Sequence, residues 1–164
     1  MLADPGRSKA AQDADLIARA VAVLALAALA VIHVVDLPGT LGPTPLVGIG
    51  YFGIIIAAIP VGAAMIVRPH WLVWAAAGSL AAAAMGGYVL TRALSGGFLG
   101  DHGDVGNWRC PLGIAALSVE TLIILLAVGW TLRARVRVRR MADEAGGPVP
   151  HPPRSRAPEY SQPS

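Results

Sequence analysis

The sequence predicts an all-α fold, an integral membrane four-helix bundle with both termini in the cytoplasm and a disordered C-terminal tail. The first observation is composition: of 164 residues, 55% are hydrophobic and only 14% are charged, which is too apolar for an ordinary soluble domain of this length. The second is that the apolar residues come in blocks of about 20, the length that crosses roughly 30 Å of hydrocarbon. The third is a one-sided distribution of basic residues, which indicates the orientation.

The chain begins with a polar segment. We expect residues 1–15 to form a short cytoplasmic tail and residues 16–35 to form the first span. A cleaved signal peptide is disfavoured, because the apolar run is longer than a usual signal core. Residues 36–45 (D-L-P-G-T-L-G-P-T-P) are rich in proline and glycine, which predicts an outer loop.

The second apolar block covers residues 46–67 and contains Pro60. Membrane helices tolerate proline when neighbours bond to the freed carbonyl, so we expect a kink here and not a break. The turn of residues 68–70 that follows can join only adjacent antiparallel helices. The second and third spans are therefore predicted to form a hairpin.

The third span is predicted over residues 71–90. Trp71 and Trp74 lie at its start, where indole side chains favour the membrane interface. Small residues recur every four positions and predict a face on which another helix can approach closely. These residues are Gly78, Ala82 and Gly86.

The last third of the chain holds a long loop, a span and a tail. Residues 91–110 are expected to form an outer loop and residues 111–132 the fourth span, with Pro111 suited to the first helical turn. Residues 133–164 are basic at first and then rich in Pro, Gly and Ser. That composition predicts a disordered cytoplasmic tail.

Basic residues gather on one predicted side of the membrane. That side has Arg7, Lys9, Arg19, Arg68 and five clustered arginines, Arg133, Arg135, Arg137, Arg139 and Arg140, whereas the other side has only Arg92 and Arg109. The bias predicts cytoplasmic termini in a multi-pass protein. We expect the five arginines to bind anionic lipid at the cytoplasmic face and not nucleic acid. Arginine outnumbers lysine, and Ala and Gly abound, which is typical of a GC-rich bacterial genome and favours a bacterial plasma membrane.

Glu120 is an acidic residue in the middle of an apolar block. It follows Pro111 by nine residues, which places it roughly 13 Å along the helix and near the bilayer midplane. Ionisable residues at this depth usually face the bundle interior and mark function. A protonated, hydrogen-bonded acid is one expectation for it. The alternative is a purely structural bond to Ser79, Tyr88 or a backbone carbonyl.

Other polar side chains are predicted in the outer half of the bundle, within reach of Glu120. His33 and Asp36 lie at i and i+3 on one face of the first span, and Tyr88 and Arg92 lie near the outer end of the third. Tyr51 lies in the outer half of the second span. The bland interpretations are an interfacial histidine and an aromatic belt with a snorkelling arginine. Because every helix contributes a polar group, we predict a shared outward-facing pocket.

The loop of residues 91–110 adds a second group of candidates. Long loops without secondary structure are often lids or binding loops. Its candidate binding residues are Asp101, His102, Asp104, Asn107 and Trp108. Asp101, His102 and Asp104 supply ligands that hard or borderline cations accept, but this metal-site pattern is weak and lacks EF-hand spacing. A hydrated polar loop is the alternative, and no cofactor is expected.

Several kinds of chemistry have no support in the sequence. Cys110 is the single cysteine, which excludes an intrachain disulfide and a cysteine-based metal cluster. His33 is the only histidine within a predicted span, so paired axial haem ligands are missing. The phosphate-binding, serine-hydrolase and zinc-protease motifs do not occur.

The chain contains three runs that carry a resemblance. They are G-Y-V-L-T-R from Gly87, then G-D-x-x-D-x-G-N-W, and P-L-G-x-x-x-L-x-V-E ending at Glu120. In these runs the chain resembles small four-span membrane proteins of bacteria in which such a loop joins the last two spans. The resemblance implies the architecture and no particular activity.

Three functional hypotheses follow. The first is a non-enzymatic membrane protein whose outer pocket and loop bind a small ligand, an ion or a partner, which could be another membrane protein or a second copy of the chain. The second is a proton-coupled transporter in which Glu120 binds a proton and a cation in turn. The third is a metal-handling protein or enzyme that uses side chains such as His33, Asp36 and His102.

Overall fold

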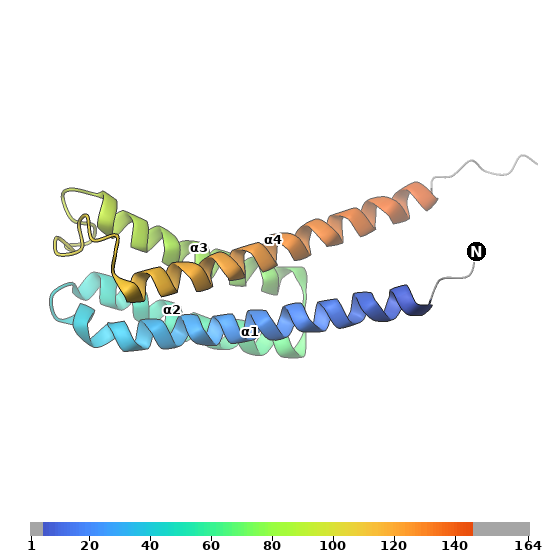
Figure 1. The fold of residues 1–164 in the computed structure, drawn as a ribbon, viewed down its shortest axis with the longest axis horizontal. Helices are drawn as coiled ribbons and strands as arrows, with labels where there is room; N and C mark the ends of the chain where they lie inside the picture. The colour runs from blue at the N-terminus through green and yellow to red at the C-terminus, as the bar shows by residue number, and fades with distance from the viewer. Residues whose placement is uncertain (1–4, 146–164) are drawn as a thin grey trace, which may run out of the picture. The chain divides into compact units, whose positions relative to one another are not determined.

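The computed structural model describes residues 5–145, apart from the side chains of residues 5–8, 137 and 140–145. In this part of the chain the regular structure is helical and consists of four helices (Figure 1). They are α1 (Pro5–Leu41), α2 (Pro45–Val67), α3 (Trp71–Ala93) and α4 (Pro111–Ala145). The chain up to Leu132 forms one compact unit, and the chain from Arg133 forms a second.

Each of the four described helices contains a stretch that is long and apolar enough to cross a membrane. Their large apolar side chains lie mostly on the outside: Leu24 is 69% exposed and Ile59 is 66% exposed. A soluble protein of this size does not present such continuous apolar surface to water. The all-helical fold and the four membrane-length helices agree with the prediction, and they indicate a multi-pass membrane protein.

The interior is built from small side chains with a few large ones between them. In α1, Ala22, Ala25 and Leu29 follow each other at the i, i+3, i+7 spacing of one helix face. The other helices contribute further buried residues to the same core, namely Met65, Trp74, Ala77, Ala81, Ala84, Ile123 and Ala127. Alanine lets helix backbones approach closely, which is how helices gain packing energy in a lipid environment.

The small-residue face of α3 differs from the predicted one. A Cβ atom added at Gly78 would lie 3.0 Å from the Cβ atom of Ala127, so this glycine does permit a close approach of α4. Ala82, however, is exposed. The buried residues Ala77, Ala81 and Ala84 instead lie on the same face of α3 as Trp74. This face is turned inward because burying an indole removes more apolar surface from solvent than burying glycine or alanine.

Trp74 corrects a second prediction. It is 1% exposed and stacks on Trp130, with ring centroids 5.8 Å apart and an interplanar angle of 18°. The Nε1–H group of Trp130 donates to Asp15 Oδ1 at 3.3 Å, which links α4 to α1. Trp71, one turn earlier, is exposed as expected for an interfacial indole. Trp74 is therefore a core residue. It lies one turn further along α3 than Trp71, where it meets the Trp130 ring of α4.

Helix α1 extends beyond both of its predicted limits. It begins at Pro5, in the segment predicted as a tail, where alanines favour the helix and Arg19 pairs with Asp15 one turn away. It continues to Leu41, so the predicted loop of residues 36–45 is wrong for residues 36–41. Pro38 lies inside the helix, where proline removes only one backbone donor. The connection to α2 shrinks to residues 42–44.

Helix α4 also continues past its predicted end. It runs through the basic segment to Ala145, so disorder was wrongly predicted for residues 133–145, where arginine is a good helix former. Arg133, Arg135 and Arg139 are exposed, as lipid contacts require. The side chains of Arg137 and Arg140, and the predicted disorder of residues 146–164, lie outside the described residues.

The remaining connections set the position of the site. Residues 68–70 join α2 to α3, as predicted for a hairpin, and the Nδ1 atom of His70 accepts a bond from Leu72 N at 3.4 Å. Helix α2 passes through Pro60 without interruption. Residues 94–110 connect α3 to α4, on the same side as the turn of residues 42–44 (Figure 1). We call this side the loop end of the bundle.

Candidate functional site

Arg92 is the central residue of the loop end. It belongs to the last turn of α3 and is 6% exposed. Its guanidinium pairs with Asp104 at 3.1 Å and lies over the Tyr88 ring, 3.7 Å from the ring centroid. Nε donates to the Asn107 carbonyl at 3.1 Å, and Nη1 donates to Thr91 Oγ1 at 2.7 Å. The interpretation of Arg92 as a snorkelling residue is therefore wrong, because its charge is held inside the protein.

The loop of residues 94–110 folds over this arginine. The backbone carbonyl of Arg92 accepts from Gly106 N at 3.0 Å, and the Asp101 carboxylate accepts from Asp104 N at 3.1 Å. Gly97 has a φ of +76°, and a side chain there would also collide with the ring of His102. These contacts give the loop a defined path.

Tyr88 connects the loop to the start of α4. Its hydroxyl donates to the Trp108 carbonyl at 3.4 Å, and the two aromatic rings meet edge to face with centroids 6.2 Å apart. A Cβ atom added at Gly113 would overlap the Tyr88 ring. Glycine at position 113 thus lets α4 pass directly against the Tyr88 ring. Helices α3 and α4 together form this face of the site.

His33 and Tyr51 form the opposite face of the site. The His33 ring is buried, and its Nδ1 atom lies 2.9 Å from the Leu29 carbonyl, which requires a proton on Nδ1. The rings of His33 and Tyr51 meet edge to face, with centroids 4.8 Å apart and an interplanar angle of 86°. Asp36 follows His33 by nearly one helical turn. The orientation of the His33 ring is therefore fixed by the hydrogen bond to the Leu29 carbonyl and by the contact with the Tyr51 ring.

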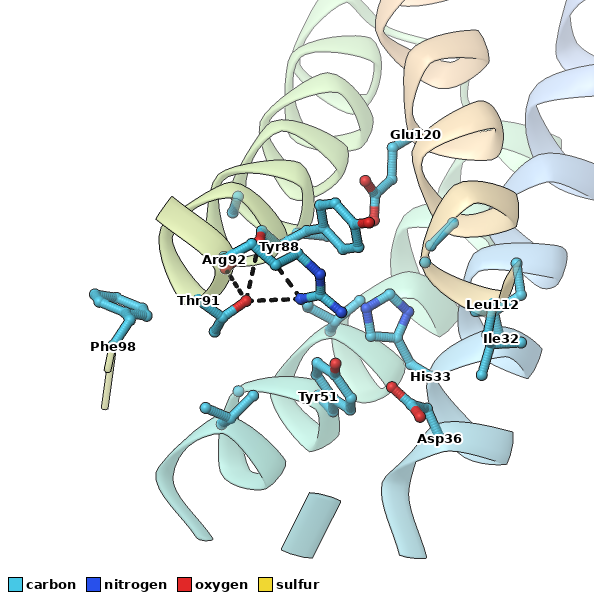
Figure 2. A pocket seen from close by; sticks show the side chains of 18 of the residues that line it. Ile32, His33, Asp36, Tyr51, Tyr88, Thr91, Arg92, Phe98, Leu112 and Glu120 are labelled. Carbon is cyan, nitrogen blue, oxygen red and sulfur yellow. Dashed lines mark hydrogen bonds between the residues drawn. The ribbon is translucent and has the colours of Figure 1, made fainter. Parts of the chain in front are cut away.

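Between these two faces lies a cavity of about 180 Å³ at the loop end (Figure 2). The six residues predicted for the pocket all line it: His33, Asp36, Tyr51, Tyr88, Arg92 and Glu120. Tyr51 lines it from α2, so each of the four helices contributes a polar side chain. Apolar residues such as Ile32, Ile54 and Leu112 make up much of the remaining wall. The predicted convergence of polar groups is present in the structure.

Glu120 reaches this cavity from α4 (Figure 2). The residue is 1% exposed, and its Oε2 atom is buried without a hydrogen-bond partner. Among the described residues it has no bond to Ser79 or Tyr88, the partners that a structural role would use; Ser79 is exposed. A buried carboxylate oxygen without a donor is unfavourable by at least about 1–3 kcal/mol. The cavity therefore contains an acceptor that the protein itself leaves unsatisfied.

None of the loop candidates lines the cavity. Within the described part of the chain, no three His, Cys, Asp or Glu side chains come together in an arrangement that could hold a metal ion. Asp101 and Asp104 are engaged inside the loop, and His102, Asn107 and Trp108 are exposed. The loop residues that line the cavity are instead Phe98, Leu99 and Cys110.

The cavity residues that were not singled out as site residues from the sequence include Thr91, Phe98 and Cys110. Thr91 bonds to Arg92 and, through the same hydroxyl, to the Tyr88 carbonyl at 2.9 Å. Its position next to a helix-terminal arginine was the available signal. Phe98 gave no such signal, since its place depends on the path of the loop.

The fold and the site define a helical protein with four membrane-length helices and a mixed polar and apolar cavity at one end of the bundle. No protein-family model, curated protein or solved structure matches the chain. The resemblance to small four-span bacterial membrane proteins stays a prediction.

Proposed function

We propose that the chain is a multi-pass protein of the bacterial cytoplasmic membrane that binds a small ligand in the cavity at its loop end, without catalysing a reaction and without a cofactor. In this proposal the loop end faces outward and both termini are cytoplasmic. The asymmetry of Lys and Arg supports that orientation. The exposed arginines at positions 133, 135 and 139 then contact anionic lipid at the cytoplasmic face.

The observation that carries the proposal is Glu120 Oε2, a buried acceptor without a partner at a cavity that is also lined by polar groups of the other three helices. Ionisable groups inside a membrane bundle are costly, and they usually mark ligand or ion sites. The size supports a small organic ligand, because an engineered protein cavity of about 150 Å³ takes up benzene.

Cys110 allows a direct test, because it is the only cysteine and lines the cavity. We would measure its alkylation by N-ethylmaleimide in lipid nanodiscs, with and without three benzene-sized probes of different charge: benzylamine, benzyl alcohol and benzoate. At least one probe is expected to slow the reaction by about tenfold, which corresponds to roughly 1.4 kcal/mol of binding free energy.

A cavity-filling variant and a matched control make the test specific. Ala116→Phe places a large ring in the cavity and should abolish protection, whereas Ala115→Phe, on the adjacent exposed position, should retain it. Thermal unfolding of both variants verifies that they fold. Protection that survives in Ala116→Phe, or no protection by any probe in the original chain, would refute ligand binding in this cavity.

A second candidate function is proton-coupled transport of a small solute. The burial of Glu120 favours it, since a carboxyl that lacks a fixed partner can bind a proton and a cation alternately. In proteoliposomes, Glu120→Gln should abolish benzylamine-driven proton flux while leaving the thermal unfolding midpoint close to its original value. Flux of undiminished rate in that variant would remove this candidate.

A further inference from the structure

The charges around the cavity are not balanced. Arg92 is paired with Asp104 at 3.1 Å, so its positive charge is offset by a loop carboxylate. Asp36 and Glu120 also line the cavity, yet neither takes part in an ion pair among the residues that the structure describes. His33 is close in sequence to Asp36, but the two side chains form no ion pair either. Two acidic groups thus lack a cationic partner.

The walls of the cavity suit an organic cation better than an inorganic one. Tyr51, Tyr88 and Phe98 bring three aromatic rings to the lining. Aromatic faces attract ammonium groups, and the attraction is larger where water is excluded. The described residues offer no cluster of three metal ligands, and apolar walls cannot replace the hydration shell of a small inorganic ion. An anion would meet two carboxylates and an arginine that is already paired.

We propose that the cavity binds a small organic ammonium ion, with the ammonium group donating to the unpartnered Oε2 atom of Glu120. The apolar part of the ligand lies against the apolar and aromatic walls. The partly exposed Asp36 adds a second negative charge that favours cations over neutral molecules. This assignment of the ligand class rests on the proposed function of the cavity.

The test compares the three probes individually by titration calorimetry in nanodiscs near neutral pH. Benzylamine, which is cationic there, should bind about tenfold or more tightly than its neutral isostere benzyl alcohol, because a hydrogen bond between charged groups is stronger than one from a neutral hydroxyl. Benzoate should bind weakest. Glu120→Gln keeps the shape of the side chain and should bring the preference for benzylamine over benzyl alcohol close to one.

Three further variants make the interpretation specific. Asp36→Asn should reduce the preference by a smaller factor, and Asp13→Asn, which neutralises an exposed carboxylate of the same helix outside the cavity, should leave it unchanged. Glu120→Asp retains the carboxylate and should therefore keep part of the preference for benzylamine over benzyl alcohol that Glu120→Gln loses.

The outcomes are distinguishable. Equal binding of benzylamine and benzyl alcohol, or tightest binding of benzoate, overturns the ammonium assignment and leaves the ligand cavity standing. A cation preference that persists in Glu120→Gln overturns the role of this carboxylate. If none of the three probes binds to the original chain, the proposed function itself is refuted.

Discussion

At the scale of single residues, Arg92 has the largest structural role at the loop end. Its side chain contacts Tyr88, Thr91, Asp104 and Asn107, and its backbone carbonyl accepts a bond from the loop. A buried guanidinium is tolerated because its donors and its charge are all engaged. The cation stacked on Tyr88 also holds that ring beside the cavity. One side chain therefore couples the path of the loop to the wall of the site.

Arg92→Lys is expected to loosen the loop although the positive charge is kept. Lysine cannot reproduce the fixed geometry of the guanidinium bonds to Asp104 and Asn107 or its stacking on Tyr88. We expect hydrogen exchange at the amide of Gly106 to accelerate by about tenfold or more, a loss of at least roughly 1.4 kcal/mol of local stability.

Arg109→Lys is the matched control for this substitution. Arg109 belongs to the same loop and is exposed. Exchange at Gly106 should remain as in the original chain. Equal acceleration in both variants would show that Arg92 has no special part in ordering the loop.

The polar residues of the cavity could be predicted, whereas the contacts of the loop could not. Helix rise fixes the depth of a residue, so His33 and Tyr88 could be assigned to the outer half of the bundle and Glu120 to a deeper position within reach of it. The pair of Arg92 and Asp104 depends on a loop path that uses positive φ angles at Gly97, Gly100, Gly106 and also Leu99. No periodic pattern encodes such a path. From the sequence, a snorkelling arginine and a hydrated polar loop were therefore the simpler interpretations.

At the scale of helices, the site depends on how closely α4 passes α3 and α1. Gly113 and Gly78 mark two close approaches between α3 and α4, one against Tyr88 and one against Ala127. Trp130 joins α4 to both neighbours, by stacking on Trp74 and by a hydrogen bond to Asp15. These contacts hold the helix that carries Glu120 in place relative to the opposite wall of the cavity.

Gly113→Ala should disturb the contact between α3 and α4. The added methyl group overlaps the Tyr88 ring, and overpacking of this kind costs about 1–3 kcal/mol. We expect a lower thermal unfolding midpoint in detergent and weaker protection of Cys110 by benzylamine, because the displaced ring belongs to the cavity wall.

Gly129→Ala serves as the comparison, since it lies on the same helix and its added methyl group meets no atom within 4 Å. That variant should match the original chain in both measurements or be slightly more stable, because alanine favours a helix over glycine. If the two alanine variants behave alike, the close contact at Gly113 is not important for the site.

Helix boundaries were less predictable than the existence of the helices. Proline and glycine between residues 36 and 45 are typical of a loop, yet α1 continues to Leu41. Pro38 removes one backbone donor, the one that would bond to the carbonyl of Val34, yet the helix continues through it. Composition does not show whether a helix ends at a proline or continues past it. It identifies the apolar block and leaves its ends uncertain by several residues.

At the scale of the whole molecule, apolar side chains cover the outside of the helices and small side chains fill the centre. Exposed residues such as Leu24, Ile59 and Leu125 would meet lipid in the proposed arrangement, and polar side chains are collected at one cavity. Burial of ionisable groups within a membrane is costly. The structure concentrates this cost at the loop end, where we propose that a ligand binds.

The proposed outward-facing ligand cavity is tested most directly by the side of the membrane from which Cys110 reacts. Sealed right-side-out and inside-out membrane vesicles that contain the full chain would be treated with a membrane-impermeant maleimide, which can modify only this cysteine. An outward-facing cavity predicts fast labelling in right-side-out vesicles, slowed by benzylamine, and little labelling in inside-out vesicles. Labelling confined to inside-out vesicles, or equal labelling that benzylamine does not slow, would contradict an outward-facing ligand cavity.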